Sequence, residues 1–235
     1  MKYELYIIIV TIISAIISYL IGSISSAVIF TRLIAKTDVR DHGSGNAGLT
    51  NVLRTAGKKA GIFTLICDLA KGLLSVAVGK YAAYAVLGYL TNGQIKNYLD
   101  PLYLAYICGF FCILGHIYPI YFNFRGGKGA LSGLGTVILI DWRIFLILLV
   151  IFLLSVIITK YISVGSILGA ISLPISTIFI QNVKETGTTF SLFGMPQKVV
   201  MTIFAALFAC LVIIKHKDNI KRLFKGQESK FSIKK

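Results

Sequence analysis

Charged residues are scarce in this 235-residue chain, and acidic residues are the scarcest of all. Only 33 residues are charged, 24 basic and 9 acidic, which is 14% of the chain, whereas 56% are hydrophobic. Soluble domains average about 25% charged residues, so a water-soluble globule and a disordered chain are both excluded. The formal net charge of +15 raises the question of nucleic-acid binding. The basic residues, however, stand between long uncharged runs, which predicts a polytopic membrane protein and no nucleic-acid partner.

Cysteine is also rare, and its four residues do not predict a metal site. All four lie in apolar segments: Cys67, Cys108, Cys112 and Cys210. Cys108 and Cys112 share a helix face at i, i+4, but no further cysteine or histidine completes a four-ligand set at zinc-like spacing. We therefore expect these cysteines to pack as small apolar residues, and we expect no metal.

Long apolar runs occupy most of the chain. A membrane-spanning helix needs about 20 apolar residues, because the hydrocarbon core is roughly 30 Å thick and each residue rises about 1.5 Å. The predicted spans are 5–31, 60–88, 101–122, 127–141, 142–160, 164–182 and 198–214. The fourth is short and glycine-rich and could cross only part of the bilayer. The prediction is an all-α polytopic membrane protein of about seven helices in one domain, residues 1–235. Five full spans plus re-entrant pieces is the main alternative.

The distribution of lysine and arginine predicts the orientation. With an odd number of crossings, 17 of the 24 basic residues fall in one set of loops and 6 in the other, with Lys71 inside a span. Basic residues are retained in the cytoplasm during insertion, so the N-terminus is predicted outside and the C-terminal tail inside. The six residues of the outer set are Lys2, Lys80, Lys96, Arg143, Lys184 and Lys198.

Four polar stretches on the predicted cytoplasmic side are too dense to be ordinary loops. The first, residues 38–54, holds three glycines within six residues, whose amides can turn toward an anion. From Asn46 to Arg54 the pattern could open a helix with its N-terminal amides facing a ligand. Taken alone, such a sequence is more often only a turn. Its candidate anion-binding residues are Gly43, Ser44, Gly45, Asn46, Thr50 and Asn51.

The second stretch, residues 115–130, joins Gly115-His116 to Gly126-Gly127-Lys128-Gly129. Glycines around a lysine at the start of an apolar helix form a natural phosphate cradle. The pattern is not a Walker A loop, which needs a glycine five residues before its Gly-Lys pair and Ser or Thr after it; Phe122 and Gly129 stand there instead. ATP hydrolysis through that motif is excluded.

The third and fourth stretches are weaker signals alone. The third, residues 160–166, contains Ser166 and would pass for a connecting loop. In the fourth, residues 215–228, His216 and Asn219 are at i, i+3 and would face the same way on a continuing helix. By itself that segment is typical of a basic tail that binds anionic lipid head groups. Each Lys or Arg contributes about 1 kcal/mol to such binding.

Two charged residues interrupt the second apolar run. Asp68 and Lys71 are at i, i+3, and each charge at a bilayer centre costs about 2.5–3.5 kcal/mol. Such residues usually pair or serve a site. They could close the bottom of a polar pocket formed by the four stretches, or they could form a structural salt bridge.

The shortage of carboxylates excludes several enzyme classes. No paired Asp or Glu is available for acid–base catalysis, and no Ser-His-Asp set can be assembled from local motifs. The nine acidic residues are scattered, so they supply no aspartate cluster for the metal of a CDP-alcohol phosphotransferase. A His-x4-Asp acyltransferase motif is absent, because the residues five after the histidines are Ala47, Tyr121 and Lys221. Cations, glycines and neutral donors suit phosphate binding at a membrane surface. Two classes remain: an enzyme whose substrates carry phosphate and a lipid chain, or a transporter of an organic phosphate or similar anion.

Taken together, the stretches resemble the acyl-phosphate:glycerol-3-phosphate acyltransferase family of bacterial inner membranes, the PlsY family. The resemblance covers nearly the whole chain, from Gly22-Ser23 to residues 225–228. Its motifs are Gly-Ser-Gly-Asn…Thr-Asn-Val-Leu-Arg at 43–54, Asp-x-x-Lys-Gly at 68–72, Gly-His-x-x-Pro…Gly-Gly-Lys-Gly at 115–129 and His-x-x-Asn-Ile-Lys-Arg…Gly-x-Glu at 216–228. Any one is a weak signal, but all four in order at the right spacing are a strong one.

The resemblance implies transfer of a fatty acyl group from acyl phosphate to the 1-hydroxyl of sn-glycerol 3-phosphate. The products would be 1-acylglycerol 3-phosphate (lysophosphatidate) and phosphate, in the first step of bacterial phospholipid synthesis. It also implies no cofactor, no metal and no acyl-CoA. The protein would lie in the bacterial inner membrane in contact with lipid, with its active site on the cytoplasmic side and a functional link to the enzyme that makes acyl phosphate.

The same resemblance implies the site residues. The catalytic set would be Ser44, Arg54, Lys128, His216 and Asn219. The substrate- and phosphate-binding set would be Gly43, Gly45, Asn46, Thr50, Asn51, Asp68, Lys71, His116, Gly126, Gly127, Gly129, Ser166 and Glu228. The chain departs from the family pattern at Ile24-Ser25-Ser26, at Gly165 and at Ala130-Leu131-Ser132. The last two departures weaken a hydroxyl role near those positions.

Two routes for the proton remain open. No residue is an evident base, so the phosphate of the acyl donor could accept the hydroxyl proton while Arg54 and Lys128 stabilise the leaving phosphate. Alternatively His216 could be the base, since a histidine pKa is ordinarily near neutral. We favour the substrate-assisted route.

Overall fold

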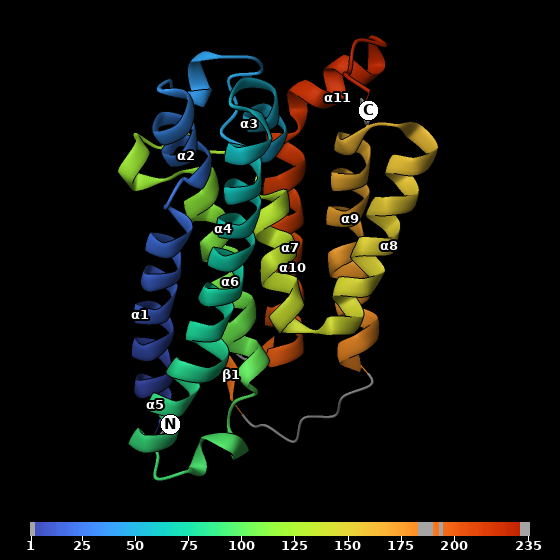
Figure 1. Cartoon of the computed structure of the whole chain (residues 1–235). Helices are drawn as coiled ribbons and strands as arrows, with labels where there is room; N and C mark the ends of the chain where they lie inside the picture. The colour runs from blue at the N-terminus through green and yellow to red at the C-terminus, as the bar shows by residue number, and fades with distance from the viewer. Residues whose placement is uncertain (1–2, 183–189, 193–194, 231–235) are drawn as a thin grey trace.

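The computed structural model of the chain describes residues 3–182, 190–192 and 195–230. Within these residues, seven apolar helices run along the long axis of one bundle (Figure 1). They are α1 (Glu4–Gly22), α4 (Gly57–Ala77), α6 (Pro101–Ile117), α7 (Ala130–Ile140), α8 (Trp142–Thr159), α9 (Ile162–Asn182) and α10 (Gln197–Lys215).

Shorter elements lie near the ends of the bundle. The helices are α2 (Ser26–Ala35), α3 (Leu49–Thr55), α5 (Tyr84–Leu90) and α11 (Lys217–Phe224), with 3-10 turns η1 (Val39–Asp41), η3 (Gln94–Asn97) and η4 (Ile120–Phe122). A π-helix, η2 (Val78–Ala83), joins α4 to α5. Two short strands, β1 (Ser191–Leu192) and β2 (Met195–Pro196), pair antiparallel.

The lengths of these segments confirm an all-α membrane protein. Six segments of the described chain are long and apolar enough to cross a membrane: 4–35, 57–90, 101–122, 142–159, 162–180 and 197–215. The predicted short fourth segment is helix α7, of only 11 residues. At about 1.5 Å per residue it is roughly 16 Å long, about half of the hydrocarbon thickness.

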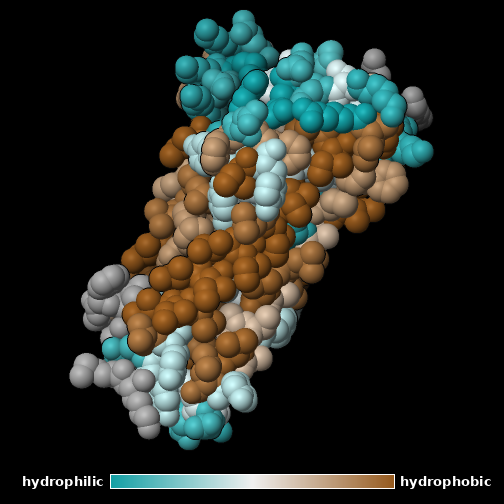
Figure 2. Space-filling view, turned by 90° about the vertical axis from the view of Figure 1, so that its left-hand side faces the viewer, coloured by the Kyte–Doolittle hydropathy of each residue, from teal (hydrophilic) through white to brown (hydrophobic). Residues whose placement is uncertain are grey.

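The outer surface of the bundle is apolar over most of its height. Figure 2 shows a broad hydrophobic belt on one side, below a polar end. Large apolar side chains are also exposed on helices α8 and α9, with Ile158 at 78% and Phe179 at 71%. In water such exposure would be unfavourable, whereas lipid tails match it. The core lies around α6, which packs against α1, α4, α7 and α10 and buries 13 of its 17 residues.

Three element boundaries differ from the sequence-based predictions. The run predicted as one span over 5–31 is two helices, because the chain breaks at Ser23–Ser25 between α1 and α2. The helix predicted to open at Asn46 begins at Leu49 and has seven residues. The segment predicted to continue through His216 ends α10 there and starts a separate helix, α11.

The polar stretches gather at one end of the bundle. Helix α1 begins at the opposite end from α11, as Figure 1 shows. Lys80, counted above in an outer loop, lies instead within the segment 57–90, on the π-helix. Lys2 and Lys184 lie outside the described residues. The side of the membrane that each end faces stays a prediction.

Candidate functional site

The first glycine loop, residues 42–48, is held by one buried side chain. Asn51, only 2% exposed, accepts a hydrogen bond from the Ser44 amide at 3.1 Å. Its Nδ2 donates to the carbonyls of Val39, His42 and Asn46 at 2.9–3.1 Å. Asn51 thus satisfies the backbone of its own loop, so it positions the loop and does not face a ligand. Gly43, at φ +59°, has the left-handed conformation that this loop requires.

An ion-pair cluster ties this loop to the second glycine loop. Asp38 accepts hydrogen bonds from Arg40 at 2.8–2.9 Å, and these hold the pKa of that carboxyl well below its usual range. The other arm of Arg40 donates to the Phe122 carbonyl at 2.9 Å. The carbonyl of Ala47 also lies against Gly127. The two glycine stretches therefore meet at the polar end of the bundle, as the sequence predicted.

Lys128 lies where the second loop enters α7. Gly129, at φ +84°, is the N-terminal cap of that helix, so Lys128 is the residue before the cap. Its ammonium group donates to Asn219 Oδ1 on α11. Lys128 and Asn219, 91 residues apart in the sequence, are thereby brought into direct contact.

Glu228 completes a network around this contact. Its Oε1 accepts hydrogen bonds from Asn219 Nδ2 at 2.6 Å and from the Ser163 hydroxyl at 2.9 Å. Its Oε2 pairs with Arg222 Nε at 2.7 Å. The network therefore joins the loop before α7, the start of α9, helix α11 and the segment after it.

The surroundings of the network lower the pKa of Lys128, so its ammonium group loses its proton more easily than that of an ordinary lysine. Burial and the nearby charges of Arg222 and Arg54 lower the pKa of Lys128 to about 8, although Glu228 and Asp218 oppose this. Burial opposes the charge on Glu228, but hydrogen bonds from Asn219, Arg222 and Ser163 outweigh it and hold the Glu228 pKa below its usual value. Lys128 is thus close to half-charged at pH 8, where a bound phosphate would favour its protonated form.

His216 lies beside the network with one ring nitrogen already engaged. Its Nδ1 is 2.7 Å from the Val212 carbonyl, so this nitrogen carries the proton and Nε2 keeps its lone pair. Burial first, and the charge of Lys128 after it, lower the pKa of His216 to about 4. At neutral pH the imidazole is uncharged and can accept a hydrogen bond at Nε2, but it is a weak base.

Asp68 and Lys71 form the structural salt bridge that was one of the two alternatives. The pair lies buried on α4, with Nζ 2.8 Å from Oδ1. The Ser26 hydroxyl donates to Asp68 at 2.6 Å, and Lys71 donates to the Ile24 carbonyl at 2.9 Å. Lys71 therefore satisfies a backbone carbonyl at the break between α1 and α2, and Asp68 holds the first residue of α2.

Other residues that were predicted for the site lie outside the Lys128–Asn219–Glu228 network. Ser44, Thr50 and Arg54 are exposed at the polar end, and Arg54 is near enough to lower the pKa of Lys128. Ser166 donates to the Ile162 carbonyl of its own helix, while Ser163, one turn earlier, contacts Glu228. Ser163 and Arg222 were missed from the sequence. For Arg222 the available signal was its i, i+3 spacing from Asn219.

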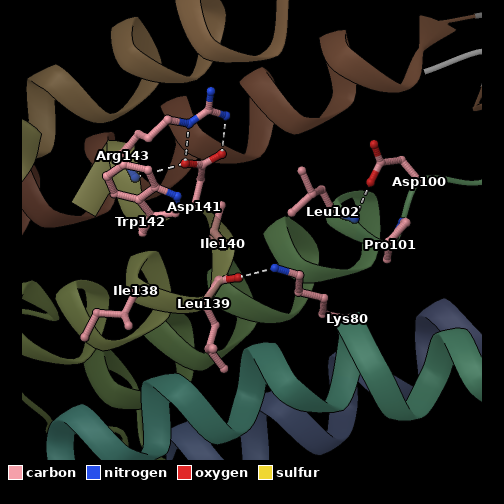
Figure 3. Close-up of a pocket in the computed structure, with 10 residues that line it drawn as sticks. All are labelled: Lys80, Asp100, Pro101, Leu102, Ile138, Leu139, Ile140, Asp141, Trp142 and Arg143. Atoms are coloured by element: carbon pink, nitrogen blue, oxygen red, sulfur yellow. Dashed lines mark hydrogen bonds and ion pairs between the residues drawn. The ribbon is translucent and has the colours of Figure 1, made fainter. Parts of the chain in front are cut away.

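A pocket of about 610 Å³ lies away from this network, at the far end of α7 (Figure 3). Its polar side chains form hydrogen bonds with backbone groups at the end of α7 and the start of α8. Lys80 donates to the Leu139 carbonyl at 2.6 Å, and Asp141 accepts from the Arg143 amide at 3.0 Å and pairs with its guanidinium. Because Lys128 precedes the opposite end of α7, this pocket is not part of the candidate site. Among the described residues no group of three or more His, Cys, Asp or Glu could hold a metal ion.

Comparison with known proteins identifies the family. The family model described as glycerol-3-phosphate acyltransferase matches residues 12–226. The chain belongs to this family. A glycerol-3-phosphate acyltransferase of Photobacterium profundum is 40% identical over 213 residues, which cover 91% of this chain and 89% of that protein. One from Clostridioides difficile is 40% identical over 225 residues, covering 95% of this chain and 97% of that protein.

Solved structures of the glycerol-3-phosphate acyltransferase family share the fold. The crystal structure of PlsY (YgiH), an integral membrane glycerol 3-phosphate acyltransferase, in its glycerol 3-phosphate form has a TM-score of 0.72 and 29% identity, covering 94% of this chain and 96% of that chain. Its lysophosphatidic acid form has a TM-score of 0.69 at the same identity, covering 94% and 95%. The family resemblance seen in the motifs is thereby confirmed, and the chain is a multi-pass membrane protein.

Proposed function

We propose that this chain transfers a fatty acyl group from acyl phosphate to the 1-hydroxyl of sn-glycerol 3-phosphate. The observation that carries the proposal is the Lys128–Asn219–Glu228 network, built next to two glycine loops in a member of the glycerol-3-phosphate acyltransferase family. The network offers cationic and neutral donors at one end of an apolar bundle. Such a site suits a phosphate group on a molecule whose acyl chain lies among apolar helices.

The proposed step is one acyl transfer. The oxygen of the glycerol 1-hydroxyl attacks the carbonyl carbon of the acyl phosphate, and the bond from that carbon to the phosphate oxygen breaks. The new ester bond gives lysophosphatidate, inorganic phosphate leaves, and the hydroxyl proton passes to the leaving phosphate. Lys128 and Arg54 would stabilise the negative charge that develops on that phosphate, the kind of interaction that usually contributes most to catalysis.

The surroundings of His216 support substrate assistance over a histidine base. Its pKa of about 4 makes it a poor acceptor of a full proton, while its free Nε2 can orient the attacking hydroxyl by accepting a hydrogen bond. The nearby carboxylates are also engaged, Glu228 with three donors and Asp68 with Lys71 and Ser26. The phosphate of the donor is then the group that we propose accepts the hydroxyl proton, while Lys128 and Arg54 stay charged.

We also propose the cellular setting implied by this reaction. The polar end, which carries the basic loops, would face the cytoplasm, and the chain would lie in the inner membrane of a bacterium. A separate enzyme must supply acyl phosphate, because the chain offers no motif for making that mixed anhydride. The glycerol 3-phosphate form and the lysophosphatidic acid form of PlsY support the choice of acceptor and product.

The experiment that tests the proposal compares acyl donors. Purified protein in detergent is given glycerol 3-phosphate and either palmitoyl phosphate or palmitoyl-CoA, and the lipid product is identified by mass spectrometry. We expect 1-palmitoylglycerol 3-phosphate from palmitoyl phosphate and none from palmitoyl-CoA. Equal use of palmitoyl-CoA would contradict the proposed donor. If neither donor yields product but vesicles containing the protein take up an organic phosphate, the transporter function considered from the sequence would replace the enzyme.

A further inference from the structure

His116 lies buried near the end of α6, directly beneath the second glycine loop. It is 7% exposed, and its Nδ1 is 3.0 Å from the Ser132 hydroxyl on α7. The same nitrogen is 3.8 Å from Asp68 Oδ1, an oxygen that Lys71 and Ser26 also contact. One edge of the ring is thus fixed by Ser132 on α7 and Asp68 on α4, and Asp68 is itself held by Lys71 and Ser26.

The opposite edge of the ring supports the glycine loop. A Cβ added at Gly127 would overlap His116 Nε2, so the imidazole lies directly against that backbone. The Gly127 amide donates to the His116 carbonyl at 3.1 Å, and a Cβ at Gly126 would overlap the same carbonyl oxygen. Only glycine permits this approach at either position. The next residue along the chain is Lys128.

This place is also where the two glycine loops meet. The same added Cβ at Gly127 would come within 2.6 Å of the Ala47 carbonyl oxygen. Gly127 is therefore clamped between the His116 ring and the first loop. A shift of the ring would move the backbone that carries Lys128 and alter the contact between the loops.

We propose that His116 is a positioning residue that aims Lys128 at a substrate phosphate by holding Gly126–Gly127, without itself touching substrate. The family resemblance placed His116 among the substrate-binding residues, but both edges of its ring are occupied by protein. This inference rests on the proposed function, because it assigns His116 a role in placing that site's lysine. Supporting groups of this kind fix the orientation of the residues that bind ligand.

The test is a double-mutant cycle of His116→Ala and Gly127→Ala, measured with palmitoyl phosphate and glycerol 3-phosphate in detergent. A displaced phosphate loop raises the KM of at least one substrate, by about tenfold for each single variant. Partial unfolding, in contrast, lowers only the active fraction and leaves both KM values unchanged. Because His116→Ala removes the ring that the new Cβ at Gly127 would meet, the loss in the double variant should be smaller than the product of the two single losses.

Two further variants keep the outcome decisive. Ser132→Ala removes only the hydrogen bond to His116 Nδ1 and should raise, about threefold, the KM that the two single variants raise. This variant tests the positioning role if His116→Ala does not fold. Arg125→Ala, in the same loop but exposed, should keep wild-type KM values. Wild-type KM values in folded His116→Ala and Ser132→Ala protein, or multiplied losses in the double variant, would overturn the proposal. An inactive wild-type enzyme would instead overturn the proposed function.

Discussion

At the scale of single residues, Lys128 predicts the pH dependence of the reaction. Its pKa in the folded protein is about 8, below the ordinary lysine value of 10.5, so it loses its proton as pH rises through 8. If its charge stabilises the leaving phosphate, kcat/KM should fall with an alkaline limb near that pH. Lys128→Arg keeps a permanent cation, so any activity that it retains should extend to higher pH. A wild-type rate that is flat to pH 9.5 would show that the charge of Lys128 is not needed.

His216 gives a second prediction at this scale. Because its pKa of about 4 leaves it neutral and weakly basic, His216→Gln should lower kcat by less than about tenfold. Loss of a general base costs about 100- to 10,000-fold. The comparison needs kcat at saturating concentrations of both substrates. A fall of several orders of magnitude with unchanged KM would favour the histidine base over substrate assistance.

The sequence predicted residue types better than residue roles. Lys128, Asn219 and Glu228 were all named as site residues through the resemblance to the PlsY family, and the structure joins them in one hydrogen-bond network. Asn51 was expected to face a ligand, yet its amide is used by its own loop. Ser166 was named in place of Ser163, because spacing within a helix does not show which hydroxyl meets a partner 65 residues away.

At the scale of elements, the close packing of α4 against α7 holds the short helix that follows Lys128. A Cβ at Gly135 would overlap the Leu69 carbonyl of α4, as expected where small residues let helices approach in a membrane. Gly135→Ala should therefore lower the free energy of unfolding by about 1–3 kcal/mol. The matched control is Gly169→Ala on α9, where the nearest atom is 3.9 Å away. Equal unfolding midpoints in detergent for the two variants would contradict this packing.

Helices were predictable from the sequence, but their interruptions were not. Six of the predicted apolar runs coincide with segments of the described chain that are long enough to span a bilayer, and the short fourth run coincides with helix α7. The break at Ser23–Ser25 carries no charge or proline to mark it, and it is stabilised by Asp68 and Lys71 from another helix. The π-helix that carries Lys80 and the new helix that begins after His216 are changes of helix geometry, which a hydropathy pattern does not report.

At the scale of the whole molecule, the positive charge predicts the orientation. Lys58→Cys, at the polar end, and Lys96→Cys, at the opposite end, are both exposed positions. In intact cells a membrane-impermeant maleimide should label Lys96→Cys, whereas Lys58→Cys should react only after the cells are opened. Four native cysteines make the unmodified protein the necessary control. The reverse labelling pattern would place the proposed active site outside the cytoplasm.

The central claim is that this bundle catalyses acyl transfer from acyl phosphate at the Lys128 network. Its most direct test is the initial rate of inorganic phosphate release from palmitoyl phosphate by the purified wild-type protein, with and without glycerol 3-phosphate. We predict release that depends on the acceptor, with one lysophosphatidate formed for each phosphate. Release at the same rate without acceptor, or none at all from protein shown to be folded, would contradict the claim.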